Sequence, residues 1–220
     1  HLAAYQWLAR RGWIDRVFIH DINADRIDAA LQRWPHCIRW TQDLLERPWC
    51  VSVCTPPESP PLALPLFALK PRAVLIEKPL ALHTHDADTL LAEATRHRVL
   101  LFTGHSERFN PALRDPELVR VLRDSNQHPR QLKFWRQSPP PKPPRARLDV
   151  VRDLMIHDLD LALMWFGPEI VEIQAGRASA QHVWAKFTWA NNDQAWLWAN
   201  AEEGAPLVRR AGGSATTGGR

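Results

Sequence analysis

The sequence predicts an α/β fold, a doubly wound parallel sheet, followed by an α+β domain with an antiparallel sheet. Three observations predict it. Short apolar runs alternate with helical segments up to Gly104, as in parallel sheets covered by helices on both faces. A stiff proline-rich segment, 139–144, then marks a change of pattern. Beyond it, one long helical segment precedes three runs that alternate like strands.

The elements of the first half are short and closely spaced. We expect strands at 16–21, 37–40, 51–54, 73–76 and 99–103. We expect helices at 23–34, 41–46, 62–69 and 85–97. The opening residues, 2–10, already have helical periodicity, so we expect the chain to begin inside a helix, with the first strand of the sheet missing.

The pattern in the second half of the sequence predicts helices together with a meander of antiparallel strands. We expect helices at 116–124 and 149–166, the latter stopped by Gly167-Pro168, and strands at 131–137, 171–177, 183–190 and 194–199. Beyond Glu203 the sequence is rich in small residues and has no periodicity. The predicted units are therefore a nucleotide-binding domain at 1–104, a substrate and oligomerisation domain at 105–201, and a disordered or frame-shifted tail at 202–220.

Composition narrows the function classes. The net charge of +4 comes from arginines spread along the chain, without the basic clusters of nucleic-acid surfaces. The apolar runs are far shorter than the roughly 20 residues of a membrane span. Cys37, Cys50 and Cys54 lack C-x-x-C spacing and lie in apolar segments, which indicates reduced, buried thiols. We therefore expect a cytoplasmic protein that binds neither nucleic acid nor membrane.

Asp21 ends the first predicted strand, where a carboxylate can accept hydrogen bonds from the ribose hydroxyls of a dinucleotide. Such a carboxylate favours NAD over NADP because it repels a ribose phosphate. The alternative is a turn former or a helix N-terminal acid. No G-x-G-x-x-G loop, which would bind the phosphates of a dinucleotide, occurs in the 220 residues.

Two further segments follow apolar strands: Thr55-Pro56 and Glu77-Lys78-Pro79. In doubly wound sheets the carboxyl ends of strands are where ligands bind, so both segments are placed to contact a cofactor. The amine of Lys78 could also hydrogen-bond a reacting hydroxyl. The alternative is a surface lysine in a turn made rigid by Pro79.

The stretch from Asp153 to Asp160 carries the clearest catalytic pattern. Asp153 and His157 are four residues apart, so a helix presents both on one face, and Asp160 extends the same stripe. An imidazole there can exchange a proton while a carboxylate orients it or binds substrate. Two alternatives remain: a histidine satisfied by Asp153 or Asp158, and a metal site built from the histidine and the carboxylates.

Glu77-Lys78-Pro79, the segment 104–111 and the stretch from Asp153 to Asp158 occur together and in one order. On these segments, the chain over about residues 2–201 resembles the glucose-fructose oxidoreductase and inositol dehydrogenase family, Gfo/Idh/MocA. Segments 108–111 and 149–161 look most similar to members of the UDP-N-acetylglucosamine 3-dehydrogenase type. The resemblance implies a Rossmann-like domain that binds a nicotinamide cofactor and a substrate domain with an open, mostly antiparallel sheet.

The resemblance also implies residue roles. Lys78 matches the lysine of the Glu-Lys-Pro motif, and Asp153 and His157 match an Asp-x-x-x-His pair; these three are the expected catalytic residues, with His157 as the acid/base. The expected cofactor contacts are Asp21, Thr55, Pro56, Glu77 and Lys78, and the expected substrate contacts are Arg108, Asn110 and Asp153, with Arg147 as a further candidate. No metal is expected. Pro60 stands where the family often has a histidine.

The expected function is thus an NAD-dependent oxidoreductase, with NADP less favoured, that acts on a secondary hydroxyl of a sugar or nucleotide sugar. An open sheet face in the second domain favours a homo-oligomer. The chief alternative is a non-catalytic relative on the same fold that binds a dinucleotide or a sugar, because fold alone does not fix function. A metal-dependent hydrolase is a third alternative.

Overall fold

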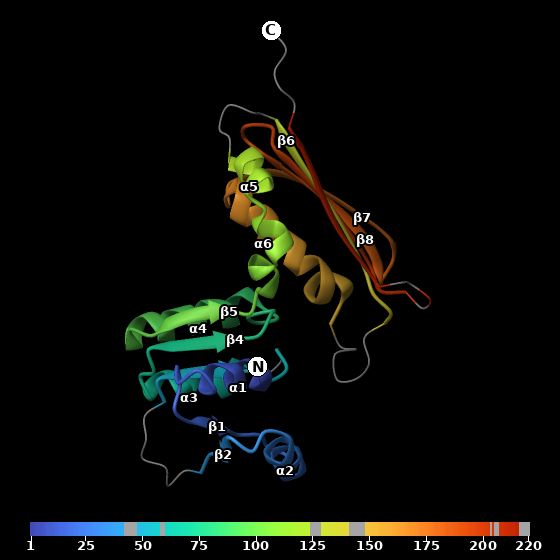
Figure 1. Cartoon of the computed structure of the whole chain (residues 1–220). Coiled ribbons are helices and arrows are strands. Elements are labelled where there is room, and N and C mark those ends of the chain that lie inside the picture. The colour runs from blue at the N-terminus through green and yellow to red at the C-terminus, as the bar shows by residue number, and fades with distance from the viewer. Residues whose placement is uncertain are drawn as a thin grey trace.

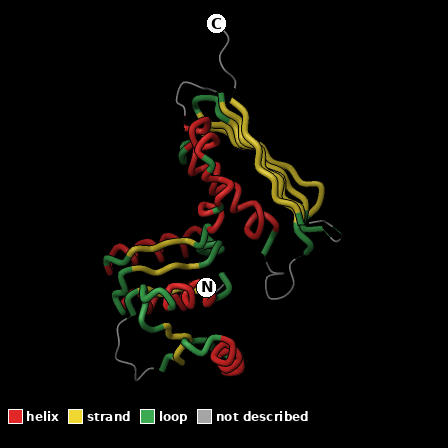
Figure 2. Tube along the Cα trace, in the orientation of Figure 1, coloured by secondary structure: helices red, strands yellow, loops and turns green. Residues whose placement is uncertain are grey.

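The molecule has two layered parts joined near residue 104 (Figure 1). The computed structural model describes residues 1–41, 48–57, 60–123, 129–140, 148–202, 204 and 207–215. The first part holds short parallel strands with helices beside them. The second part is one long sheet with helices against one face, as the secondary-structure colouring of Figure 2 shows.

The first part contains two parallel sheets. Strand β1 (Val17–Ile19) pairs with β2 (Cys37–Arg39), and β3 (Cys50–Val53), β4 (Ala73–Ile76) and β5 (Leu100–Thr103) form the other sheet in sequence order. Its helices are α1 (Leu2–Ala9), α2 (Ala24–Arg33), α3 (Pro60–Ala68) and α4 (Thr84–His97). Among the described residues β1 and β3 do not pair, so the two sheets stay separate.

Local sequence explains where these helices start and stop. The Asn23 side chain accepts a hydrogen bond from the Arg26 amide and caps α2. Helix α4 ends at Arg98, whose left-handed backbone closes the last turn. Buried residues of α3, α4 and the three-stranded sheet, among them Phe67, Val74 and Leu90, form the core of this part.

The second part is a five-stranded sheet. Its strands are β6 (Arg130–Gln137), β7 (Ile170–Ser179), β8 (His182–Trp189), β9 (Gln194–Asn200) and β10 (Val208–Ala215), in the order β10-β6-β9-β8-β7. All neighbours are antiparallel except β6 and β9, which are parallel. The helices are α5 (Pro116–Arg123), α6 (Ile156–Phe166), the π-helical η4 (Val151–Met155) and the 3-10 turns η1 (Ser106–Phe109) and η2 (Pro111–Arg114).

Helix α6 covers one face of this sheet (Figure 1). Strand β6 alternates strictly, with Leu132 and Phe134 buried and Lys133 and Trp135 exposed. Phe134 packs with Leu161 of α6 and other buried side chains in one continuous cluster. The period of two therefore divides the sheet into a covered face and an open face.

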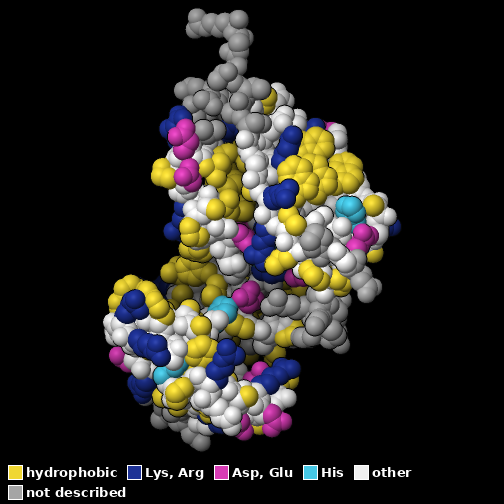
Figure 3. Space-filling view, turned by 45° about the vertical axis from the view of Figure 1, so that its right-hand side comes forward, with side chains coloured by type: hydrophobic (Ala, Val, Ile, Leu, Met, Phe, Trp, Pro, Cys, Tyr) yellow, Lys and Arg dark blue, Asp and Glu magenta, His cyan; other side chains and the backbone are white. Residues whose placement is uncertain are grey.

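The open face carries a row of tryptophans. Trp135 stacks on Trp198 with ring centroids 4.6 Å apart, and Trp196 and Trp184 continue the row at 5.8 and 6.4 Å. Figure 3 shows hydrophobic side chains gathered on this side of the molecule. Gly176, opposite Trp184, leaves room for that indole, since a Cβ there would lie 2.6 Å from its Nε1. We call these four tryptophans the tryptophan row.

Most predicted elements are confirmed within two residues, and the predicted fold class is confirmed. The predicted helix at 149–166 is confirmed in extent, but its first turns are π-helical. The predicted helix at 41–46 lies almost wholly outside the described residues.

Two predictions were wrong. The first was that residues beyond Glu203 are disordered, because 208–215 form β10, whose backbone pairs with β6 along its whole length. Backbone pairing needs no side-chain periodicity, so no local pattern of residues predicts this strand. The second was that all three cysteines are buried, because Cys37 is buried whereas Cys50 and Cys54 are exposed.

Candidate functional site

The strand ends of the three-stranded sheet meet at one edge. The Glu77 amide donates to the Val53 carbonyl oxygen at 3.0 Å, and the Gly104 amide donates to the Ile76 carbonyl oxygen at 2.8 Å. These contacts continue the ladder by one residue beyond β4 and β5, and they set Gly104 against Glu77. The carboxyl ends of β3, β4 and β5 thus lie at one edge, and the prediction that a ligand binds there stays a prediction.

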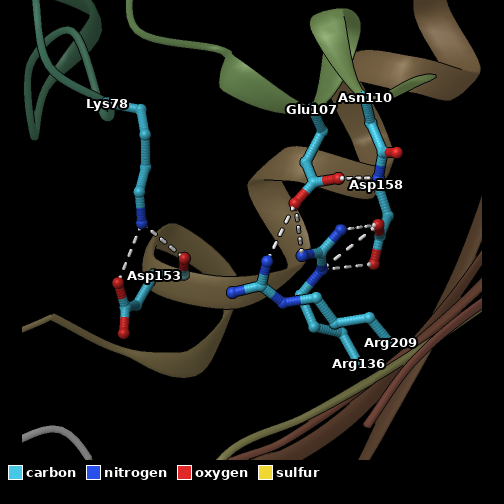
Figure 4. Close-up of polar contacts among 7 residues, drawn as sticks. All are labelled: Lys78, Glu107, Asn110, Arg136, Asp153, Asp158 and Arg209. Atoms are coloured by element: carbon cyan, nitrogen blue, oxygen red, sulfur yellow. Dashed lines mark hydrogen bonds and ion pairs between the residues drawn. The ribbon is translucent and has the colours of Figure 1, made fainter. Parts of the chain in front are cut away.

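Lys78 reaches from this edge into the second part of the molecule. Its Nζ donates to Asp153 Oδ1 at 2.9 Å and to the Asp153 backbone oxygen at 2.6 Å (Figure 4). Both side chains are only 15% exposed, so the ion pair is shielded from solvent. The alternative of a surface lysine is therefore wrong, and the role of Lys78 as a site residue stays a prediction.

Asp153 lies in the π-helical segment η4, directly before α6. A wider π turn at this point changes how the backbone carbonyls are presented, and such turns are frequent at functional sites. The Asp153 carbonyl oxygen is one of the two acceptors of the Lys78 amine. The sequence had predicted a regular α-helix here, so the backbone contact was not foreseen.

His157 lies one turn further on, in α6. Burial first, and then the nearby cations Lys78 and Arg136, lower the pKa of His157 to about 4. The imidazole is therefore neutral at pH 7. Its Nδ1 is buried and has no hydrogen-bond partner among the described residues, so no carboxylate satisfies that nitrogen there. A neutral imidazole beside an ammonium group can accept a proton from a hydroxyl that the amine orients.

Glu77 and Asp21 occupy different surroundings. Glu77 Oε1 lies 2.7 Å from Nε2 of His1, at the start of α1. Asp21 follows β1 and accepts a hydrogen bond from the Asn23 amide at 2.9 Å, while its second oxygen lies 3.9 Å from Arg26 Nη1. Asp21 thus forms a turn, as the alternative held, and its carboxylate is still partly exposed at the end of a strand. Thr55 and Pro56 are exposed after β3.

The predicted substrate contacts are engaged within the protein. Arg108 donates from Nε and Nη2 to both oxygens of Asp160, at 2.7 and 2.6 Å. Asn110 accepts from the Ala112 amide at the start of η2 and donates to Glu107 at 3.1 Å. Asp160 therefore pairs with Arg108 rather than extending the stripe of Asp153 and His157. Arg147 lies outside the described residues.

A buried ion network whose charges act on His157 was not predicted from the sequence. Arg136 donates to Asp158 Oδ1 at 2.5 Å and to Glu107 Oε1 at 3.3 Å, and Glu107 also receives Arg209 and Asn110 (Figure 4). Burial opposes the charge of Arg136, but the hydrogen bond and charge of Asp158 outweigh it, so the pKa of Arg136 is raised. The sequence does hold one sign of this network: Arg136 follows Leu132 and Phe134 at a spacing of two, so it lies on the same buried face of the strand.

Among the described residues, no group of three histidine, cysteine or acidic side chains is placed to hold a metal ion. In the same part of the chain, no helix has both the length and the apolar character needed to cross a bilayer.

Comparison with known proteins gives a consistent result. Residues 4–105 match the family model described as the oxidoreductase family with an NAD-binding Rossmann fold, GFO_IDH_MocA. The chain is 41% identical over 102 residues to UDP-N-acetylglucosamine 3-dehydrogenase from Acidithiobacillus ferrooxidans. The aligned region covers 46% of this chain and 30% of that protein. It is 32% identical over 109 residues to myo-inositol 2-dehydrogenase from Thermotoga maritima, covering 46% and 31%.

The likeness extends to the second part of the molecule in three dimensions. The solved structure of UDP-N-acetylglucosamine 3-dehydrogenase from Acidithiobacillus ferrooxidans superposes with a TM-score of 0.77 and 30% identity over 96% of this chain and 70% of that one. The matched sequence regions span less than a third of the length of both curated relatives.

Proposed function

The chain belongs to the Gfo/Idh/MocA family of oxidoreductases with an NAD-binding Rossmann fold, and from this we propose that it works as a dehydrogenase on a secondary hydroxyl of a sugar or nucleotide sugar. The observation that carries the proposal is the meeting of Lys78, Asp153 and neutral His157 at the carboxyl edge of a parallel sheet. Relatives with 41% and 32% identity act, by name, on a nucleotide sugar and on an inositol.

The cofactor in this proposal is NAD. Its fit is supported by the exposed Thr55-Pro56 after β3, by the half-buried Glu77 after β4 and by the Asp21 carboxylate after β1. Asp21 would accept hydrogen bonds from a ribose, and Thr55, Pro56 and Glu77 would line the cofactor edge. When bound, NAD supplies the acceptor for the electron pair that leaves the substrate carbon.

The protein residues handle the proton and the position of the hydroxyl. The Lys78 ammonium, held by Asp153, donates a hydrogen bond to the reacting oxygen and favours its negative charge as the O–H bond breaks. His157 is neutral, so its free nitrogen accepts that proton. The carbon–oxygen bond becomes a carbonyl as the C–H electron pair departs. In the reverse direction His157 returns the proton.

The proposal divides the chain by task. Residues 1–104 bind the nucleotide, and residues 105–201 bind substrate, with Asp153, Arg108 and Asn110 as candidate contacts. Arg108 contributes through its ion pair with Asp160, and Asn110 contributes through the turn that it caps at the start of η2. Three cysteines without disulfides support a cytoplasmic location as part of the same proposal.

A homo-oligomer completes the proposal. The tryptophan row lies on the open face of the five-stranded sheet, opposite the face covered by α6. A contiguous aromatic surface of this kind marks an association site, and tryptophan is enriched at such interfaces. A second copy of the same open face would cover the row with a two-fold interface.

The test measures NADH formation from NAD with UDP-N-acetylglucosamine and with myo-inositol, using the complete protein. The His157→Ala variant should lose roughly 100-fold to 10,000-fold in turnover, the usual contribution of an acid/base group, while NADH binding stays within about twofold. The matched control is His85→Ala, which removes an exposed histidine of α4. Turnover of His157→Ala equal to the control would disprove the assignment; NADH binding without any turnover would favour a non-catalytic relative.

A further inference from the structure

A second histidine, His105, stands beside the proposed catalytic group without a part in it. It follows β5 directly, and the register pairs Ile76 with Thr103. His105 therefore lies two residues beyond this pair, where the chain turns, and it is close enough to Lys78 for the charge of that amine to act on it. The charge of His105 also acts on His157, so the two imidazoles and the Lys78 amine share one locality.

A negatively charged carboxylate faces one nitrogen of the His105 ring, beyond hydrogen-bond distance. Its Nε2 lies 3.7 Å from Asp160 Oδ1. Asp160 cannot turn away, because Arg108 holds both of its oxygens. A carboxylate facing one ring nitrogen favours the tautomer that carries its proton there. The charge of Asp160 thus favours the tautomer of His105 with its proton on Nε2 and a lone pair on Nδ1.

The Nδ1 of His105 is buried and has no hydrogen-bond partner among the described residues. Burial lowers the pKa of His105, more than the Asp160 carboxylate raises it, and Arg108 and Lys78 lower it further. The ring is thus neutral at pH 7 and its Nδ1 is an acceptor. Buried acceptors are normally paired, so the unpaired Nδ1 of His105 is open to a hydrogen bond from a ligand, a water molecule or an ion.

A purely structural role does not account for this histidine. Asp160 is already satisfied by two short hydrogen bonds from Arg108, and the His105 contact of 3.7 Å is too long for a third. As the residue before η1, His105 makes no side-chain capping bond. In the His105 ring, Nε2 therefore faces the fixed carboxylate of Asp160, and Nδ1 has no hydrogen-bond partner among the described residues.

We propose that Nδ1 of His105 accepts a hydrogen bond from a second hydroxyl of the substrate, one that is not oxidised. This rests on the proposed function and narrows it. Nδ1 of His157 accepts from the reacting hydroxyl, whereas Nδ1 of His105 accepts from another hydroxyl of the same molecule. The substrate is then a polyol or sugar with at least two free hydroxyls, and a simple secondary alcohol is a poor substrate.

The kinetic test compares two substitutions. His105→Asn keeps an acceptor near the position of Nδ1, because the asparagine carbonyl oxygen occupies a similar place, whereas His105→Leu removes it. With UDP-N-acetylglucosamine or myo-inositol, whichever is turned over, His105→Leu should raise KM about tenfold with kcat within about threefold, the pattern of lost ground-state binding. His105→Asn should stay within about threefold of the native KM. Equal KM values for native protein and His105→Leu would overturn the inference.

A measurement independent of turnover uses nitrogen-15 NMR of the histidine rings. In the unliganded protein His105 should show a protonated Nε2 and an unprotonated Nδ1, and added sugar should shift only the Nδ1 signal of this ring. His105→Leu identifies the signals, and His85→Leu serves as the matched control. A proton on Nδ1, or an unchanged signal with a sugar that binds, would overturn the inference.

The two proposals fail separately. If a sugar is turned over and His105→Leu behaves as the native protein, the inference fails and the dehydrogenase stands. If a sugar binds and shifts the Nδ1 signal but is never oxidised, the dehydrogenase fails and the hydroxyl contact stands. If neither sugar binds, both are overturned.

Discussion

The amine of Lys78 donates to both the carboxylate and the backbone carbonyl of Asp153, at 2.9 and 2.6 Å. Lys78 follows a strand of the parallel sheet, and Asp153 precedes the helix that covers the other sheet. One side chain therefore ties the two parts of the molecule together at the point where the proposed chemistry takes place. Catalytic geometry and the docking of the two parts depend on the same contact.

Removing the Lys78 amine should affect both properties. In Lys78→Met, Asp153 is left largely buried without its cation, so we expect a loss of about 2 kcal/mol in the free energy of unfolding, and turnover at least about 100-fold lower. Urea unfolding and NADH formation measure the two effects. Lys133→Met, on the exposed side of β6, is the control and should change neither. A Lys78→Met protein of native stability would contradict the docking role.

His157 should make the fold sensitive to acid. Its pKa in the folded protein is about 4. The pKa of His157 in the unfolded chain is about 6.5, so between about pH 6.5 and pH 4 the imidazole is protonated in the unfolded chain but stays neutral in the folded protein. Stability is then lost as pH falls from about 6.5 to about 4, by up to about 3 kcal/mol. Above about 6.5 the group contributes nothing. Urea unfolding across this range should show a flatter pH profile for His157→Gln; identical profiles would contradict the low pKa.

Removing only one partner of the Arg136–Asp158 ion pair should lower the free energy of unfolding strongly. Asp158 is 2% exposed, and Arg136→Met would leave it buried without its cation, at a cost of about 3–5 kcal/mol in the free energy of unfolding. Replacing both residues, in Arg136→Met with Asp158→Leu, should recover most of that loss, because no unpaired charge remains. The control is Arg96→Met, which breaks the exposed pair with Glu93 at a cost below about 1 kcal/mol. A double variant no more stable than Arg136→Met would contradict this account.

Asp21 should set the choice of cofactor. Asp21→Ser removes the carboxylate that repels a ribose phosphate, and Arg26, 3.9 Å from Asp21, is then free to bind that phosphate. We expect the ratio of the NAD to the NADP affinity to fall at least about tenfold, measured by fluorescence titration of both reduced cofactors. Asp25→Ser, in the first turn of α2, is the matched control. A ratio unchanged by Asp21→Ser would remove Asp21 from the cofactor site.

The tryptophan row should control assembly. Trp198→Glu places a charge in the middle of the row, where a partner copy would have to bury it, so association should weaken at least about 100-fold. Sedimentation velocity measures the oligomeric state, and circular dichroism checks that the monomer is folded. Trp13→Glu, at an exposed tryptophan of the first part, is the control. A native protein that is monomeric at all concentrations would refute the proposed interface.

The sequence predicted the features that depend on neighbours along the chain. Apolar runs located the strands, and the end of each strand located Thr55-Pro56 and Glu77-Lys78, since the carboxyl ends of parallel strands always meet at one edge. The spacing of Asp153 and His157 placed both near the start of one helix. These inferences use only local periodicity, which the structure preserves.

The remaining features depend on pairing between distant segments. The ion network of Arg136 needs the register of β6 against α6, and the position of β10 needs backbone pairing with β6; neither is encoded in a local pattern. Likewise, His105 lies in the segment 104–111 that the sequence singled out, yet its proximity to Asp160 follows only from the packing of the two parts of the chain. The π turn at Asp153 changes the backbone without changing the apolar pattern.

The parallel pairing of β6 with β9 has a kinetic consequence. Gln131 pairs with Gln194, so this central contact of the sheet closes a long loop, whereas β7, β8 and β9 form a local meander. Loop closure costs entropy before it gains contacts, so the meander should form early and β6 should join it late. We therefore expect the arrival of β6 to be the slow step in forming this sheet, with the buried Arg130–Asp193 ion pair at its start forming only afterwards.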